Sequence, residues 1–139
     1  MKLVSWNVNG VRAIVKKDFD NIMSSLNTDV LALQETKAQD YQVSEALEGL
    51  HSLDGYEVFS CSAVKKGYSG TAIITRIHPI KVTYGIGLPE FDTEGRVLHA
   101  EFDKFHFVTV YTPNSSSAFK RLPFRGKWDV AFKKYIQEL

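Results

Sequence analysis

The spacing of apolar and polar positions predicts a strand, helix, strand unit at the start of the chain. Residues 2–8 (KLVSWNV) and 29–34 (DVLALQ) are short, branched apolar runs with the length of β-strands. Between them, residues 11–17 and 19–26 carry apolar residues at helical spacing. Such a crossover is almost always right-handed and makes its two strands parallel, so both strands should end at the same edge of one sheet.

The remainder of the chain predicts strands, with one helix before them and one after them. The expected elements are a helix over 43–50, strands over 56–60, 71–75, 80–84, 97–102 and 105–111, and a helix that starts at 122. The apolar face of the last helix consists of Trp128, Ala131, Phe132, Tyr135, Ile136 and Leu139. This helix has no capping glycine, and we therefore expect the chain to be a piece of a longer protein.

Composition and charge narrow the class of protein. With 139 residues, 44% of them apolar and 24% charged, the chain has the size and balance of one globular domain over 1–139. No apolar run could span a bilayer and the N-terminus lacks a signal-peptide core, so we expect an intracellular, cytoplasmic protein without a membrane partner. The single cysteine, Cys61, excludes an internal disulfide. A net charge of +1 means that nucleic-acid binding would need a local basic patch.

Candidate chemistry lies where the two parallel strands end. Asn7 and Asn9, in "SWNVNG", follow the first strand, and Glu35, in "DVLALQETK", follows the second. Open α/β sheets bind ligands beyond the carboxyl ends of their strands, and a carboxylate with amides and waters suits Mg²⁺ or Mn²⁺. The alternative is that the asparagines cap the next helix and that Glu35 is a solvated charge.

A tyrosine and an asparagine follow a later strand. In "VYTPNSS", Tyr111 ends the strand and Asn114 begins a loop. A hydroxyl and an amide at that place can hold phosphate oxygens. Alternatively, Tyr111 packs in the core and Asn114 closes a turn.

A basic turn opens another strand. In "KKGYSGTAI", Lys65 and Lys66 precede Gly67 and Tyr68. Cations, exposed amides and an aromatic ring on one turn suit a nucleic-acid backbone. A solvated hairpin turn explains the same residues.

Taken together, these segments resemble a known family. "SWNVNGVRA", "LALQETK", "GYSGTAI", "EGRV" and "YTPNSS…KR…FR…WD.AF" are similar, in order and spacing, to the exonuclease III and abasic-site endonuclease family of the endonuclease/exonuclease/phosphatase superfamily. The resemblance implies a four-layer α/β sandwich of two mixed sheets with helices outside. It also implies a magnesium-dependent DNA repair nuclease that hydrolyses phosphodiesters in double-stranded DNA, at abasic sites or at 3′ ends.

The resemblance assigns a role to each candidate residue. Glu35 matches the metal-binding glutamate, Asn7 the asparagine that holds the general base and the phosphate, and Asn9 a position close to the metal. Tyr111 matches the tyrosine at the scissile phosphate, and Asn114 an asparagine of the same loop. The nucleic-acid-binding group comprises Lys37, Lys65, Lys66, Gly67, Tyr68 and Arg96, of which Lys37 and Arg96 fall where the family has site-supporting charges.

The family's later Asp-x-Asn and Asp-His motifs are absent from this sequence. We therefore interpret the chain as an N-terminal half: half of the sandwich, one mixed sheet with flanking helices, whose inner face lacks a cover because the second half is absent. General acid–base catalysis typically supplies about 10²–10⁴-fold in rate, so the chain should be inactive or incomplete alone. The expected partner is the missing C-terminal half or a second copy. The alternatives are a catalytically silent DNA-binding or self-associating fragment, and a phosphatase or phosphodiesterase relative.

Overall fold

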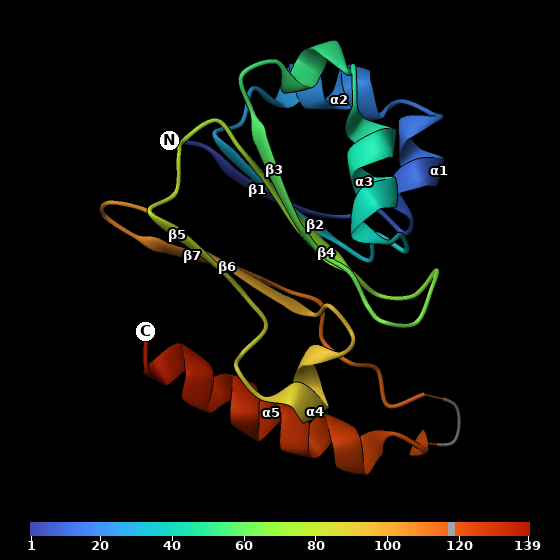
Figure 1. Ribbon diagram of the computed structural model, residues 1–139, viewed down its shortest axis with the longest axis vertical. Coiled ribbons are helices and arrows are strands. Elements are labelled where there is room, and N and C mark those ends of the chain that lie inside the picture. The colour runs from blue at the N-terminus through green and yellow to red at the C-terminus, as the bar shows by residue number, and fades with distance from the viewer. Residues whose placement is uncertain (117–118) are drawn as a thin grey trace.

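The computed structural model describes residues 1–116 and 119–139, which form helices, a sheet, a second sheet and helices in successive layers (Figure 1). The first sheet has strand order β1-β2-β4-β3 and the second β5-β6-β7. The strands are β1 (Leu3–Asn7), β2 (Val30–Gln34), β3 (Glu57–Cys61), β4 (Thr71–Thr75), β5 (Lys81–Tyr84), β6 (Val97–Glu101) and β7 (His106–Val110).

Helices cover the outer face of each sheet (Figure 1). On the first sheet lie α1 (Val11–Val15), α2 (Phe19–Leu26), α3 (Asp40–Leu47) and the 3₁₀ turn η1 (His51–Leu53). On the second lie α4 (Pro89–Asp92) and α5 (Leu122–Gln137). In the part of the chain that is described, no helix combines the length and the apolar character that a membrane crossing requires.

The predicted parallel pairing of the first two strands is confirmed. β1 pairs parallel with β2 from Leu3↔Val30 to Asn7↔Gln34, and β4 pairs antiparallel with both β2 and β3. Successive side chains of a strand point to opposite faces, so Leu31 and Leu33 pack under the helices while Val30 faces the second sheet. The mixed sheet with flanking helices that the sequence predicts is therefore present.

The expectation of an uncovered inner face is wrong, because this chain supplies strands to both sheets and not to one alone. Val30 and Ile73 of the first sheet are fully buried against Leu98, Ala100 and Phe102 of the second sheet and the turn after it. The apolar pattern of the strands could not predict which strand belongs to which sheet. A strand that is buried on both faces has the same apolar sequence in either sheet. The inner layer of the sandwich is thus closed where β2, β4 and β6 meet.

Two helices differ from their predicted bounds for local reasons. α3 begins at Asp40, earlier than expected, because Gln39 and Gln42 form a reciprocal capping box. α4 lies inside a segment that carried no strand or helix prediction, and the Asp92 carboxylate fixes the turn before it by accepting hydrogen bonds from the backbone of Ile86, Gly87 and Leu88.

The C-terminal helix packs its apolar face on the second sheet. Trp128 is buried there between α4 and the sheet, next to Phe91 and Val97. Ile136 and Leu139, expected on the same inward face, are 40% and 45% exposed. The apolar spacing therefore placed Trp128, Ala131, Phe132 and Tyr135 correctly and Ile136 and Leu139 incorrectly.

Candidate active site

Three strand ends converge at one edge of the sandwich. β1 and β2 are parallel and end at Asn7 and Gln34, and β7 packs against β2 from the second sheet. The Gln34 amide donates to Ser5 Oγ at 3.0 Å and to Thr109 Oγ1 at 2.9 Å, and so joins β1, β2 and β7. This arrangement delivers Asn7, Glu35 and Tyr111 to a common place.

Glu35 is the centre of this group, and the geometry does not support its interpretation as a solvated charge. Its Oε1 accepts hydrogen bonds from Tyr111 Oη at 3.0 Å and Asn7 Nδ2 at 3.3 Å, and its side chain is 18% exposed. Burial raises the pKa of the Glu35 carboxyl, but the hydrogen bonds to its partners outweigh burial and leave that pKa below its ordinary value. The group is therefore a carboxylate near neutral pH.

The backbone around Glu35 is held in an unusual conformation. Asn9, Glu35 and Lys37 have φ angles of 48°, 59° and 50°, in the left-handed region that non-glycine residues seldom adopt. Backbone hydrogen bonds fix this conformation, from Gly10 N to Glu35 O at 2.8 Å and from Lys37 N to Ser69 O at 2.8 Å. Strain of this kind persists where surrounding contacts impose it, often at functional sites.

A positive charge already lies between the two predicted metal ligands. Lys37 Nζ is 2.7 Å from Asn9 Oδ1 and 3.1 Å from Glu35 Oε2. The two oxygens therefore converge on one cation, and a single carboxylate with an amide oxygen is a donor set that suits Mg²⁺, which keeps several waters. Among the residues that the structure describes, no group of three or more His, Cys, Asp or Glu side chains could hold a metal. Asn9 and Glu35 therefore fit as two oxygen ligands of a hard divalent ion, and its other ligands would be waters or groups outside the described residues.

The asparagines do not cap the following helix. The N-cap residue of α1 is Gly10, and this helix has no side-chain cap. Asn7 Oδ1 instead accepts from the backbone N–H of Asn9 at 3.0 Å. Both asparagines therefore belong to the Glu35 group.

Tyr111 is linked to a second predicted tyrosine through Arg96. The Arg96 guanidinium donates to the Tyr111 carbonyl at 3.0 Å and to the Tyr68 hydroxyl at 2.9 Å. Arg96 Cζ lies 5.2 Å from the centre of the Tyr111 ring and 5.7 Å from the centre of the Tyr68 ring. Arg96 is 3% exposed. A direct contact between Arg96 and nucleic acid would require it to leave these partners, so its geometry is that of a supporting residue.

The other predicted residues lie outside the Glu35 group. Asn114 accepts from Ser116 N at 2.7 Å, which is the turn-closing arrangement that the sequence left open. Lys65 places its Nζ 4.8 Å from the centre of the Tyr68 ring. Lys66 and Gly67 are exposed at the tip of that loop.

Sequence reasoning missed two residues beside the site. Glu94 accepts hydrogen bonds from Arg96 and from Arg121, which precedes α5. The strings "EGRV" and "KR" contain both residues, but no spacing rule pairs side chains 27 positions apart. Such a pairing becomes visible when the fold brings the two loops together.

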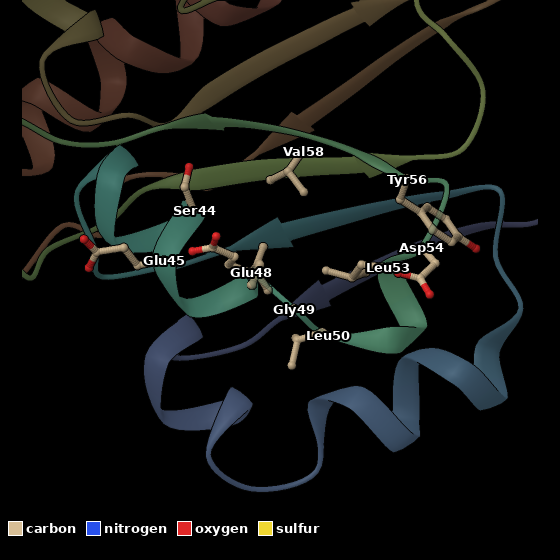
Figure 2. Close-up of a pocket in the computed structure, with 10 residues that line it drawn as sticks. Ser44, Glu45, Glu48, Gly49, Leu50, Leu53, Asp54, Tyr56 and Val58 are labelled. Atoms are coloured by element: carbon tan, nitrogen blue, oxygen red, sulfur yellow. The ribbon is translucent and has the colours of Figure 1, made fainter.

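A separate groove of about 480 Å³ opens between α3, η1 and β3 (Figure 2). Its wall carries Glu45, Glu48 and Asp54 beside apolar side chains. The residues that line this groove, all within 44–58, do not include Asn7, Asn9, Glu35, Lys37 or Tyr111. Its acidic wall would also repel a phosphate.

The chain is similar in sequence to known proteins. The family model described as Endonuclease/Exonuclease/phosphatase family matches residues 4–138. An exodeoxyribonuclease of Bacillus subtilis is 47% identical over 140 residues, which cover 100% of this chain and 53% of that protein. The DNA repair nuclease APEX1 of Danio rerio is 43% identical, with 98% of this chain and 44% of that protein covered.

Solved structures give the same likeness. The AP endonuclease LMAP from Leishmania major has a TM-score of 0.81 and 31% identity, covering 99% of this chain and 48% of that one. The 3′ phosphatase NExo from Neisseria, bound to a product DNA hairpin, has a TM-score of 0.79 and 26% identity, covering 99% and 52%. The chain therefore spans about half the length of the relatives it matches.

Proposed function

The chain belongs to the Endonuclease/Exonuclease/phosphatase family, and from that premise we propose that it forms part of a DNA repair nuclease that hydrolyses phosphodiester bonds. The observation that carries the proposal is the Glu35 carboxylate, oriented by Asn7 and Tyr111 at an edge where three strands end. The likeness to exodeoxyribonucleases and abasic-site endonucleases supports DNA as the substrate.

Each residue of the Glu35 group has a chemical task in this proposal. Hydrolysis of a phosphodiester accumulates negative charge on the phosphate oxygens, and fixed donors stabilise that charge. The Tyr111 hydroxyl and the Asn7 amide are such donors, and they now point at Glu35 Oε1. Burial, followed by the hydrogen bond to Glu35, raises the pKa of the Tyr111 phenol, so it stays a donor at neutral pH.

We propose that Glu35 and Asn9 hold a divalent metal ion, as the family implies, with Mg²⁺ or Mn²⁺ as candidates. When bound, such an ion supplies positive charge that neutralises a phosphate oxygen. Lys37 then has to yield part of its contact with these two oxygens, and its side chain, which is 41% exposed, is free to turn toward solvent or a phosphate.

A complementary polypeptide is part of the proposal. β7 packs against β2 and β4 while β6 packs against β4 and β3, so β1 and β7 lie on the same side of the sandwich. Within the described residues, each of these two strands has one neighbour, and Leu3 of β1 is 46% exposed. Strand edges of this kind accept further strands. We propose that the half of the fold absent from this chain pairs with both edges and brings an acid or base to the Glu35 group.

The proposed substrate is double-stranded DNA with an abasic site or a 3′ end. The names of the relatives include exodeoxyribonucleases, abasic-site endonucleases and a 3′ phosphatase. A phosphatase activity on DNA ends is therefore a variant of the same proposal. In this proposal, contacts with the DNA backbone come from the exposed loop of Lys65, Lys66 and Gly67, with Tyr68 at its base.

The second candidate function is a catalytically silent DNA-binding or self-associating fragment. The observation that favours it is that the described residues gather no group of three or more His, Cys, Asp or Glu side chains that could hold a metal ion. In this case the tyrosines and lysines would retain phosphate contacts without hydrolysis.

A mixing experiment separates the candidates. A labelled duplex with one abasic site is incubated with Mg²⁺ and with this chain, with the remaining half of the Bacillus subtilis exodeoxyribonuclease, or with both. We expect cleavage only in the tube that contains both halves. Glu35→Gln in this chain should abolish that cleavage, whereas the exposed control Glu45→Gln should not. Cleavage by this chain alone would contradict its incompleteness, and binding without cleavage in every tube would favour the silent fragment.

A further inference from the structure

Four polar side chains beside the Glu35 group form a closed cluster, which we call the Glu94 cluster: Tyr68, Glu94, Arg96 and Arg121. Glu94 Oε2 accepts from Arg96 Nη2 at 2.8 Å and from Arg121 Nη1 at 3.1 Å. The Tyr68 hydroxyl accepts from the same two nitrogens, at 2.9 Å and 3.0 Å. The two arginines therefore hold the tyrosine and the glutamate together.

The cluster needs its carboxylate because two cations meet in a poorly hydrated place. The side chains of Arg96, Glu94 and Arg121 are 3%, 15% and 32% exposed. Two guanidinium groups that share one hydroxyl repel each other unless an anion lies between them. Burial raises the pKa of Glu94, but hydrogen bonds, with that from Arg121 the largest, outweigh it and lower this pKa to about 2.

The cluster is connected to the Glu35 group by one strand end. Arg96 Nη1 donates to the Tyr111 carbonyl at 3.0 Å, and Tyr111 N donates back to the Arg96 carbonyl at 2.8 Å. Tyr111 in turn donates its hydroxyl to Glu35 at 3.0 Å. Within the described residues, Glu94 forms no hydrogen bond or ion pair with Glu35, so its influence on Glu35 passes through Arg96 and Tyr111.

We infer that Glu94 is a positioning residue for nucleic-acid binding: through Arg96 and Arg121 it sets where Tyr68 and Tyr111 stand. This inference rests on the proposed function, because it concerns residues that we propose to contact DNA. Glu94 does not touch the phosphate in this account. Its task is to hold Tyr68, from the loop between β3 and β4, at a fixed separation from Tyr111, which follows β7.

Removal of the Glu94 charge is expected to weaken DNA binding, which is the opposite of what charge alone predicts. DNA is an anion, so removal of an acidic residue near the binding surface should, by charge alone, tighten binding. If Glu94 acts by positioning, its removal frees Arg96 and Arg121 to move the tyrosines, and binding weakens. The direction of the change therefore separates the two mechanisms.

The test measures binding of the full chain to a fluorescein-labelled abasic-site duplex by anisotropy in the presence of EDTA. We expect Glu94→Gln to raise the Kd about tenfold, the scale of one hydrogen bond to a charged group. The matched control is Glu90→Gln, because Glu90 is an exposed acid in nearby α4. We expect the control to bind as tightly as the parent or more tightly.

A second background distinguishes positioning from a general loss of structure. In a Tyr68→Phe protein the hydroxyl that the cluster holds is gone, so Glu94→Gln should raise the Kd by a smaller factor than it does in the parent, since coupled residues are non-additive. Equal effects in the two backgrounds, or tighter binding by Glu94→Gln, would overturn the inference. If circular dichroism indicates that Glu94→Gln is unfolded, Glu94→Asp is tested instead, because it keeps the charge with a shorter side chain. Unchanged DNA binding by Glu94→Asp would also overturn the inference.

Failure of the proposed function has a different signature. If the parent chain does not bind the duplex, DNA binding by this chain is rejected, and the inference is read from the ring signals of Tyr68 and Tyr111 in NMR spectra. We expect both signals to shift in Glu94→Gln and neither to shift in Glu90→Gln. Signals that stay in place in Glu94→Gln would reject the positioning role as well.

Discussion

Two partly buried carboxylates, Glu35 and Glu94, are linked through Tyr111 and Arg96, and their surroundings differ. Glu94 is enclosed by Arg96 and Arg121, which are fixed by further internal partners. Glu35 is held by Lys37, whose side chain is 41% exposed, and by a tyrosine hydroxyl and an amide. Glu94 is therefore locked as part of the scaffold, whereas Glu35 has partners that can be exchanged for a metal or a phosphate.

The largest expected effect is the loss of the Glu94 charge. Glu94→Ala should reduce the free energy of unfolding by about 3–5 kcal/mol, because it leaves the Arg96 guanidinium buried without an anion. Urea unfolding followed by circular dichroism measures the change. A loss below about 1 kcal/mol would remove the distinction between the two carboxylates.

Acid should reveal the same distinction. The pKa of Glu94 is lowered to about 2 from 4.5, so its stabilisation is present above pH 4.5 and is lost as pH falls through its folded pKa. The full difference corresponds to on the order of 3 kcal/mol. Unfolding free energies measured from pH 6 down to pH 2 should fall less steeply in Glu94→Gln than in the parent. Parallel curves would contradict the assignment.

A glycine behind the Glu35 segment should also be sensitive. Gly70 has a φ of 90°, and a Cβ there would lie 2.2 Å from Thr36 Oγ1. Gly70→Ala should therefore cost about 2 kcal/mol through strain and displacement of the backbone next to Glu35. Gly67→Ala is the matched control, because it also has positive φ but has no neighbour within 4 Å. The two variants are compared by thermal unfolding, and equal losses would contradict the steric reason.

The smallest expected effect on stability is at Glu35 itself. Glu35→Gln should change the free energy of unfolding by less than about 1 kcal/mol, since Lys37 is free to turn to solvent. The same variant should lose binding of Mn²⁺, followed by electron paramagnetic resonance. A large loss of stability with metal binding intact would mean that the carboxylate is structural.

Much of this architecture could be predicted from the sequence. The parallel pairing of β1 and β2 follows from their apolar runs and the helical segment between them, and it brings Asn7 and Glu35 together. The role of Lys37 between Glu35 and Asn9 could not be predicted, because it depends on positive φ angles that a residue such as glutamate seldom adopts. The Glu94 cluster depends on contacts across loops that no periodicity encodes.

The sheet assignment illustrates another limit. Fully buried strands such as β4 carry apolar residues on both faces, so their pattern does not tell which sheet they join. Asn114 illustrates a third limit, since its local hydrogen bond to Ser116 is as compatible with the sequence as a phosphate contact.

The Gln34 amide, which donates to Ser5 and Thr109, offers an experimental handle on the whole edge. One amide proton is donated to Ser5 of the first sheet and the other to Thr109 of the second. Isotope labelling of this one side chain would therefore give two resonances, each of which reports on one sheet. Slow exchange of one proton and fast exchange of the other would identify which layer opens first when a partner docks.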